Sequence, residues 1–216
     1  MVFSAVYAQN AGDINLGGRA GMLFGFHRIS YDLPMNLSAF PVSIPDLLSE
    51  RSLNNFSLAL YGSYTLINNL SIQVELNYIR NQGIEFTGPL GVSLRGTIST
   101  LDIPILVKYS FLNTNVRIGI FGGLYLCIPV SDFEATVSLP VFGSTTFRYN
   151  LDGATYGFTV GASAGLPAGP GRIVGDIRYI RDLPNAQIQM YGITIDTIGR
   201  QGLSISVGYE INLRSR

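Results

Sequence analysis

Few residues in the sequence have side chains that could act in catalysis or bind a metal. His27 is the only histidine and Cys127 the only cysteine in 216 residues. A lone histidine without an acidic partner at a fixed spacing gives no activated nucleophile or acid–base pair, and hydrogen bonding at a strand end is the simpler role. His27 and Cys127 also lack the spacing of metal ligands. We therefore predict no enzyme, no metal site and no cofactor.

A patterned set of polar side chains consists of charged residues at alternate positions of apolar segments. They share the less apolar face of those segments, where Gly, Ser, Thr and Asn are common. The set is Arg19, Glu75, Asp102, Lys108, Arg117, Arg172, Asp176, Arg178 and Glu210. Positive and negative charges nearly cancel, which predicts an interior polar network. Two forms are open: a plug of paired charges, or side chains that line a pore.

Alternation of apolar and polar residues marks the segments that carry these charges. The clearest are 99–111 and 116–128, joined by Leu-Asn-Thr-Asn. Their period of two predicts a β-hairpin with strands well above the usual length of about 5–6 residues. Pro104 has no N–H to donate, so we expect a bulge or a missing hydrogen bond there. The predicted strands are 14–27, 55–66, 70–80, 99–111, 116–128, 154–166, 171–181 and 201–213.

Eight long strands, each with one apolar face, predict an all-β fold: an eight-stranded antiparallel up-and-down transmembrane β-barrel. Strands of about 9–11 residues span a membrane in such barrels. Connections alternate between short (67–69, 112–115, 167–170) and long (28–54, 81–98, 129–153, 182–200). Outer-membrane barrels have short periplasmic turns and long outer loops. We therefore expect a protein of the cell outer membrane, surrounded by outer-membrane lipid, with both termini in the periplasm.

The long connections carry further expectations. Residues 81–98 are expected to extend their two strands, 129–153 to form a small projecting hairpin, and 44–46 to begin a helical turn. Aromatic residues gather at both predicted rims, as in the aromatic belts of membrane barrels. They are Tyr64, Tyr109, Phe111 and Tyr209 at one rim, and Phe24, Phe26, Phe56, Tyr78, Tyr156 and Tyr179 at the other.

Composition favours a membrane protein. Charged residues make up 13% of the chain and the mean hydropathy is +0.30, whereas soluble domains average about 25% charged residues. The net charge of zero gives no basic surface for nucleic acid. A soluble lipocalin-like barrel, with the apolar face inward around an apolar ligand, is the alternative. The solvent-exposed outer face of such a barrel would need far more charged residues than this sequence has.

Residues 14–213 are predicted to form a single outer-membrane barrel domain. Val6-Tyr7-Ala8 before Gln9 resembles a signal-peptide cleavage site, although a basic start and a full apolar core are missing. Residues 1–13 are therefore either a signal-peptide remnant or a disordered N-terminus.

Two stretches, LDIPILVKY at 101–109 and DIRY at 176–179, resemble the PorT-like outer-membrane barrel family of Bacteroidetes-type bacteria. That family has a similar L-x-I-P-x-x-x-K-Y strand and a later R-Y strand. The resemblance implies an eight-stranded outer-membrane barrel without assigned activity, and its namesake takes part in protein secretion. The run SVGYEINL at 206–213 is also similar to the signal that the outer-membrane assembly machinery binds. It departs from that signal because Arg-Ser-Arg, not a terminal aromatic residue, follows Leu213.

Three functions are open for such a protein. The first is a closed barrel that serves as an anchor, interaction or secretion-accessory component of the cell envelope, with a protein partner at its outer loops. The second is a narrow porin-like channel for small solutes or ions. The third, which we do not favour, is an enzyme at the rim that uses His27.

Overall fold

The computed structural model describes residues 11–32, 49–88, 91–111, 116–150, 153–183, 187–190 and 193–213. No helix in these residues is long and apolar enough to cross a membrane. The strands are β1 (Ile14–Asp32), β2 (Ser49–Ser52), β3 (Asn54–Ile67), β4 (Leu70–Thr87), β5 (Ser93–Ser110), β6 (Arg117–Pro129), β7 (Phe133–Leu139), β8 (Gly143–Tyr149), β9 (Thr155–Ala168), β10 (Gly171–Asp182), β11 (Gln187–Met190) and β12 (Ile193–Asn212).

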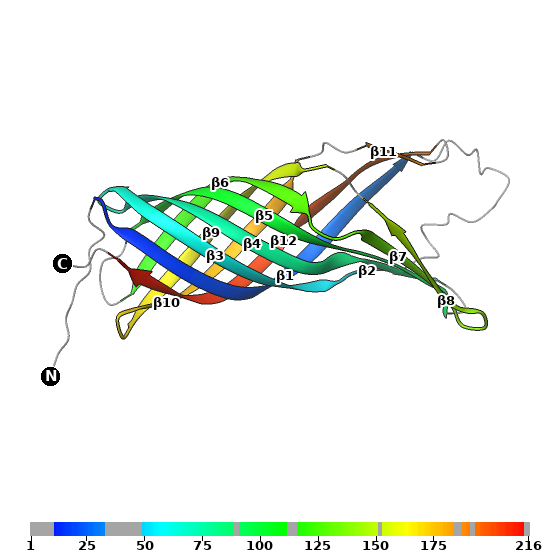
Figure 1. Ribbon diagram of the computed structural model, residues 1–216, viewed down its shortest axis with the longest axis horizontal. Coiled ribbons are helices and arrows are strands. Elements are labelled where there is room, and N and C mark those ends of the chain that lie inside the picture. Colours follow the sequence, from blue (N-terminus) through cyan, green and yellow to red (C-terminus); the bar gives the residue numbers. More distant parts are fainter. Residues whose placement is uncertain are drawn as a thin grey trace.

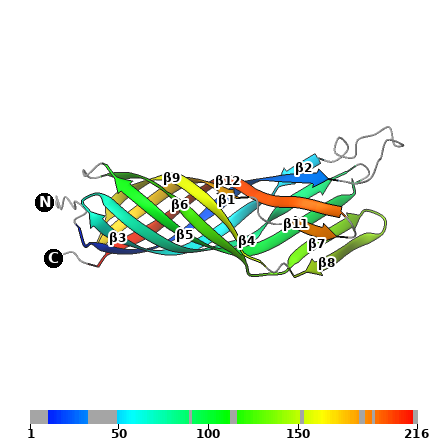
Figure 2. The ribbon, with the colours of Figure 1, turned by 90° about the horizontal axis from the view of Figure 1, so that it is seen from above.

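Eight of these strands close into a ring of antiparallel neighbours. β1 pairs with β3, and the pairing continues through β4, β5, β6, β9, β10 and β12 back to β1. Figures 1 and 2 show the resulting barrel of tilted strands. The predicted eight-stranded antiparallel up-and-down barrel is confirmed.

The two ends of the barrel differ. At the end that we call the near end, β1 begins beside the end of β12, and Asn15 pairs with Asn212. The turns at 68–69 and 169–170 are two residues long, and Asn69 and Gly169 supply the positive φ angles of 73° and 60° that these turns need. At the opposite end, the far end, β2, β7, β8 and β11 extend the sheet beyond the ring (Figures 1 and 2).

Several ring strands run further toward the far end than predicted. β1 continues to Asp32, β12 already begins at Ile193, and β4 and β5 pair out to Thr87 and Ser93. The predicted loops 28–54 and 182–200 are thus partly strand. Short alternating runs continue into these extensions, Arg-Ile-Ser-Tyr-Asp at 28–32 and Ile-Thr-Ile-Asp at 193–196, but they are too short and too polar to stand out from the long polar connections around them.

The predicted extension of strands through 81–98 and the projecting hairpin in 129–153 are confirmed by β4–β5 and by β7–β8. The predicted helical turn at 44–46 lies outside the described residues.

The ladder between β4 and β5 is interrupted at Pro104. Pairing is in register at Val74–Ile105 and again at Asn77–Asp102, with no bridge between these pairs. The missing N–H of Pro104 accounts for the gap, as expected from the sequence. A register shift follows between Ile79 and Gln82, where Asn81 has a φ angle of 50°.

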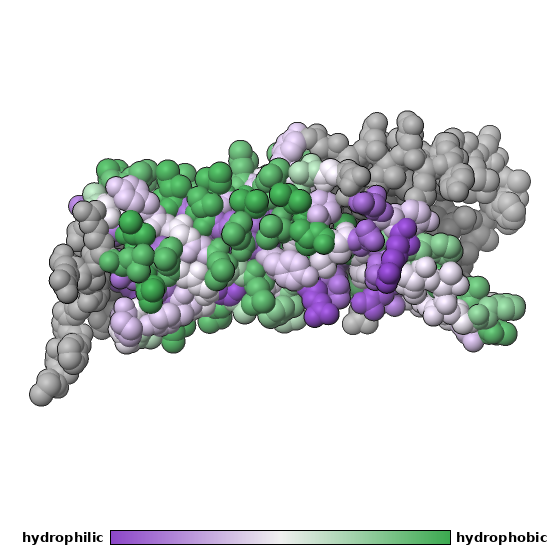
Figure 3. Space-filling model, in the orientation of Figure 1, coloured by the Kyte–Doolittle hydropathy of each residue, from purple (hydrophilic) through white to green (hydrophobic). Residues whose placement is uncertain are grey.

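The outer surface of the ring is apolar. Side chains such as Leu60 (69% exposed) and Leu124 (66% exposed) point away from the barrel, and Figure 3 shows apolar residues along the ring strands. Exposed aromatic residues mark both rims of this surface. They are Tyr64, Tyr109, Phe111 and Tyr209 toward the near end, and Phe56, Tyr78 and Tyr156 toward the far end. The lipocalin-like alternative is wrong, because it requires this apolar face to point inward.

Candidate functional site in the barrel interior

The inward face of the ring strands is polar. In β5, buried positions alternate with more exposed ones from Thr100 to Ser110, so that Asp102 and Lys108 point inward while Ile105 and Val107 point outward. The structure places all of the charged residues predicted for an interior network on this face. Glu75, Asp102, Lys108, Arg117, Asp176, Arg178 and Glu210 are buried, and Arg19 and Arg172 are half-buried.

Four of these charges meet midway along the barrel, in a group that we call the central quartet: Arg19, Glu75, Asp176 and Arg178. Arg178 donates from Nη1 to Glu75 Oε2 at 2.9 Å and from Nε to Asp176 Oδ1 at 3.1 Å. Arg19 donates to the same Glu75 oxygen and, at 3.1 Å, to Asp176 Oδ2. Two guanidinium groups and two carboxylates leave no net charge, as a buried ionic group requires.

The Glu75–Arg178 pair crosses the full width of the barrel. Glu75 lies on β4 and Arg178 on β10, and these two strands are four places apart in the ring of eight. The side chains of this pair are 0% and 3% exposed. The lumen is therefore bridged at this level by one ion pair between diametrically opposite strands.

A second bridge lies closer to the far end. Arg200 on β12 pairs with Asp102 on β5 at 2.9 Å and with Asp182 on β10 at 3.2 Å. β5 and β12 are again opposite strands of the ring. Gln82 accepts a hydrogen bond from Arg200 Nη1 at 3.1 Å, and Tyr125 donates its hydroxyl proton to Asp182.

A third group of charges lies at the near end. Arg117 on β6 is 3.7 Å from Glu210 on β12, and Arg172 stands opposite Glu210 in the register of β10 and β12. All three line a cavity of about 60 Å³. Lys108 is buried near Glu210 but forms no ion pair among the described residues. This group is looser than the central quartet.

Each of the three bridging arginines packs on an aromatic ring inside the barrel. The guanidinium carbon lies 5.4 Å from the Tyr61 ring centroid for Arg19, 4.9 Å from that of Phe121 for Arg178, and 5.3 Å from that of Tyr125 for Arg200. Such cation–π contacts hold the guanidinium in place.

A glycine of the neighbouring strand makes room for each of these rings. A Cβ atom at Gly161 would lie 2.6 Å from the Phe121 ring, and Cβ atoms at Gly17 and Gly157 would collide with Tyr61 and Tyr125. In all three places a glycine faces an aromatic ring, and the ring packs on a guanidinium group. The absence of a side chain at the glycine thus leaves room for the ring that holds each charge.

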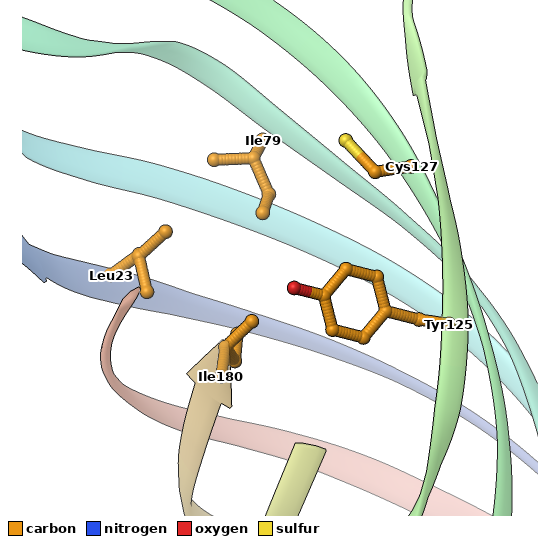
Figure 4. Close-up of a cluster of buried hydrophobic side chains, with 5 residues drawn as sticks. All are labelled: Leu23, Ile79, Tyr125, Cys127 and Ile180. Carbon is orange, nitrogen blue, oxygen red and sulfur yellow. The ribbon is translucent and has the colours of Figure 1, made fainter. Parts of the chain in front are cut away.

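A small apolar cluster lies within the same interior. Figure 4 shows Leu23, Ile79, Cys127 and Ile180 gathered around the ring of Tyr125. These side chains come from β1, β4, β6 and β10, which lie on different sides of the barrel. They are between 1% and 5% exposed. Apolar packing thus supplements the ionic bridges in filling the lumen.

Sequence reasoning missed Asp182 and Arg200, since both fell within a predicted loop. A signal for each was present in the strand phase. Arg200 is in phase with the inward Ser204 and Glu210 of β12, and Asp182 is in phase with the inward Arg178 of β10. Extending each alternation by one or two positions would have found them.

The structure gives no catalytic or metal-binding arrangement around Cys127 or His27 among the residues that it describes. Cys127 is a buried free thiol. His27 lies on β1 opposite Arg200 in the register with β12, and its side chain lies outside the described part of the chain. Within the described residues, no group of three or more His, Cys, Asp or Glu side chains could hold a metal ion.

Comparison with known proteins identifies a family that matches most of the chain. The outer membrane protein beta-barrel domain family matches residues 7–185. No curated protein matches the chain. Among solved structures, Neisserial surface protein A is 16% identical with a TM-score of 0.46, over 93% of this chain and 97% of that one.

Two further solved structures are similar. Ail, the attachment invasion locus protein of Yersinia pestis, solved with the heparin analogue sucrose octasulfate, is 13% identical with a TM-score of 0.39, over 93% of this chain and 99% of that one. The N-terminal barrel domain of Pseudomonas aeruginosa OprF is 10% identical with a TM-score of 0.36, over 94% and 100% of the two chains.

Proposed function

The chain belongs to the outer membrane protein beta-barrel domain family, and from this membership we propose that it is a closed barrel that anchors a recognition surface at its far end. In this proposal the near end, with its two-residue turns, faces the periplasm and the far end faces outward, as in other barrels of the outer membrane. The apolar ring surface contacts lipid. A component of this kind serves as an interaction or secretion-accessory protein of the cell envelope.

The observation that carries the closed state is the pair of ionic bridges across the lumen. Glu75–Arg178 and Asp102–Arg200 each join opposite strands of the ring at 2.9 Å. An eight-stranded barrel has an interior just wide enough for side chains to fill. Two transverse bridges, each supported by an aromatic ring, leave an ion no straight path along the axis.

A narrow channel is the second candidate, and one observation favours it. Asn55, Thr65, Ser110 and Ser206 are buried, and within the described residues they carry side-chain oxygen or nitrogen atoms without a hydrogen-bond partner. Unpaired polar atoms of this kind are what a hydrated lumen would offer. The channel would have to pass the central quartet, so the two candidates differ in whether that quartet opens.

Planar-bilayer recording of the refolded protein separates the two candidates. A closed barrel gives no stable single-channel steps, whereas steps in the unmodified protein would overturn the proposal. The quadruple variant Glu75→Ala/Arg178→Ala/Asp102→Ala/Arg200→Ala removes both bridges and is expected to introduce conducting events, whereas Glu75→Ala/Arg178→Ala alone keeps the Asp102–Arg200 bridge and should stay closed. A matched control, Glu134→Ala/Arg148→Ala, removes an exposed ion pair of the β7–β8 hairpin and should leave the bilayer silent. A heat-dependent shift in SDS gel mobility verifies that each variant has folded.

A further inference from the structure

The β7–β8 hairpin lies outside the ring and ends the sheet with a free edge. β7 pairs with β5, and β8 pairs with β7 but with no other described strand. All seven residues of β8 are exposed, and none is proline. An unpaired strand edge of this length offers a row of backbone donors and acceptors to another extended strand.

The two faces of the hairpin have different chemistry. On one face Phe133 stands opposite Tyr149, and Ala135 opposite Phe147. On the other face, Glu134 accepts a hydrogen bond from Arg148 at 3.1 Å, and the hydroxyl groups of a threonine pair are 3.0 Å apart. A strand added to the edge of β8 would therefore have to be apolar on one face and polar on the other.

The tip of the hairpin is a tight turn that carries apolar side chains. The Leu139 carbonyl accepts a hydrogen bond from the Phe142 N–H at 3.2 Å, and Gly143 takes a φ angle of 84° as the chain re-enters strand. Val141 and Phe142 are 85% and 86% exposed. The tip projects away from the barrel (Figures 1 and 2) and is coloured apolar in Figure 3. Neighbouring large apolar side chains exposed to this degree favour a contact with another molecule.

The base of the hairpin carries a groove of about 440 Å³. Its lining includes Ile128, Val130 and Ala154 from the segments before β7 and after β8, together with Asn150, which directly follows β8. The groove and the apolar tip lie at opposite ends of the same exposed strand.

We propose that the partner of this edge is β8 of a second copy of the chain, paired antiparallel about Thr146. Thr146 is the central residue of β8, so this register uses the whole strand. It sets Arg148 opposite Ser144, Phe147 opposite Thr145 and Tyr149 opposite Gly143, in both directions. No like charges oppose each other, and both faces of the hairpin continue into the second copy.

Two local features fit this self-pairing. A Cβ atom at Gly143 would meet nothing within 4 Å, so the space above this glycine is open to the partner copy's tyrosine ring. The same register also sets Phe142 of one copy opposite Asn150 of the other, at the groove. Strand edge, tip and groove are therefore mutually complementary.

The antiparallel arrangement determines where the two barrels lie. Since β8 runs from the tip toward the barrel, an antiparallel partner places its barrel at the opposite end of the joined sheet. Two copies would then face each other from opposed membranes and hold two outer membranes together. This consequence rests on the proposed function, because it requires the far end to face outward.

Cysteine cross-linking tests the register. In a directly opposed antiparallel pair the Cβ atoms are about 4.5–5.5 Å apart, close to disulfide geometry, and the native Cys127 is buried. Thr146→Cys protein in lipid vesicles is expected to form a disulfide dimer on mild oxidation. Thr136→Cys is the control, because Thr136 faces Thr146 from β7, away from the free edge, and should give no dimer. Absence of the Thr146→Cys dimer, or equal dimer from both variants, would overturn the proposal.

Mixing two vesicle populations that carry differently tagged protein tests the opposed arrangement. Dimers that contain both tags, together with vesicle clustering that is lost in Phe142→Asp, support it. A dimer population in which every dimer carries a single tag overturns it. The bilayer recording is independent of these results. If the protein gives no single-channel steps and forms no dimers, only the self-pairing is refuted. If it conducts ions and forms the dimers, only the closed state is refuted.

Discussion

The central quartet gives the sharpest quantitative prediction. Glu75 is 1% exposed and accepts hydrogen bonds from Arg19, from Arg178 and, at 2.6 Å, from Gln73. Glu75→Gln keeps the shape of the side chain but leaves two buried guanidinium groups with Asp176 as their one carboxylate. Breaking a buried ion pair on one side costs about 3–5 kcal/mol, and Arg178→Gln should cost a similar amount.

The double variant Glu75→Gln/Arg178→Gln tests whether the quartet acts as a unit. It removes one charge of each sign and leaves the Arg19–Asp176 pair, at 3.1 Å, to neutralise itself. The two substitutions together should therefore cost less than the sum of the single ones, by about 0.5–3 kcal/mol. Urea unfolding of the refolded protein in lipid vesicles, followed by circular dichroism, measures these differences.

An additive double variant would refute the reasoning, because it would mean that the four charges do not depend on one another. The exposed pair Glu134–Arg148, with side chains 44% and 70% exposed, provides the control. Exposed ion pairs contribute about 0–1 kcal/mol, so Glu134→Gln should change the unfolding free energy by no more than that.

Two further substitutions test the packing and the membrane surface. Gly161→Ala places a methyl group 2.6 Å from the Phe121 ring, whereas the nearest atom to a methyl group at Gly175 is 3.8 Å away. We therefore expect a marked loss of stability for Gly161→Ala and little change for Gly175→Ala. Refolding yield and urea unfolding measure both effects. Leu124→Arg puts a charge on the lipid-facing surface and should cost about 2–4 kcal/mol in the same assay, while Val141→Arg, at the hairpin tip, should be nearly neutral.

The ring of strands could be predicted from the sequence because a membrane barrel imposes a strict rule on it. Every outward position within the bilayer must be apolar, so β12 alternates from Leu203 to Ile211 without a charged residue on its outward face. The rule ends where the bilayer ends. Arg28–Asp32 and Ile193–Gly199 lie beyond it and remain paired strand, but their alternating runs are short and include charged residues, so the sequence alone does not separate them from a loop.

The partners of the interior charges could not be predicted from the sequence. The phase of each strand indicates that Glu75 and Arg178 point inward, but their contact depends on the stagger between β4 and β10, which alternation leaves undetermined. The same holds for Phe121 over Gly161. Their neighbouring strands β6 and β9 pair at this position, but alternation is equally compatible with registers that differ by two residues, so the sequence does not select this one.

The ionic interior also follows from the two demands that a barrel strand must meet. If β10 and β12 were apolar on both faces, each would be an unbroken apolar run, which is prone to aggregation before insertion. Polar residues at alternate positions avoid this and keep the period of two. Once the ring closes, however, every enclosed charge needs a partner, since an uncompensated buried charge costs several kcal/mol.

Bridges between opposite strands satisfy both demands. The pairs are Glu75–Arg178 and Asp102–Arg200. Each pair places a charged residue on the inward face of each of its two strands, so all four strands stay amphipathic. Inside the barrel the two charges of a pair neutralise each other, and their contact favours the stagger that brings the two residues together. In the proposed closed state, the same contacts block the lumen. These contacts lie within the ring, so in the proposed function they hold the barrel together while the far-end strands and the β7–β8 hairpin form the recognition surface.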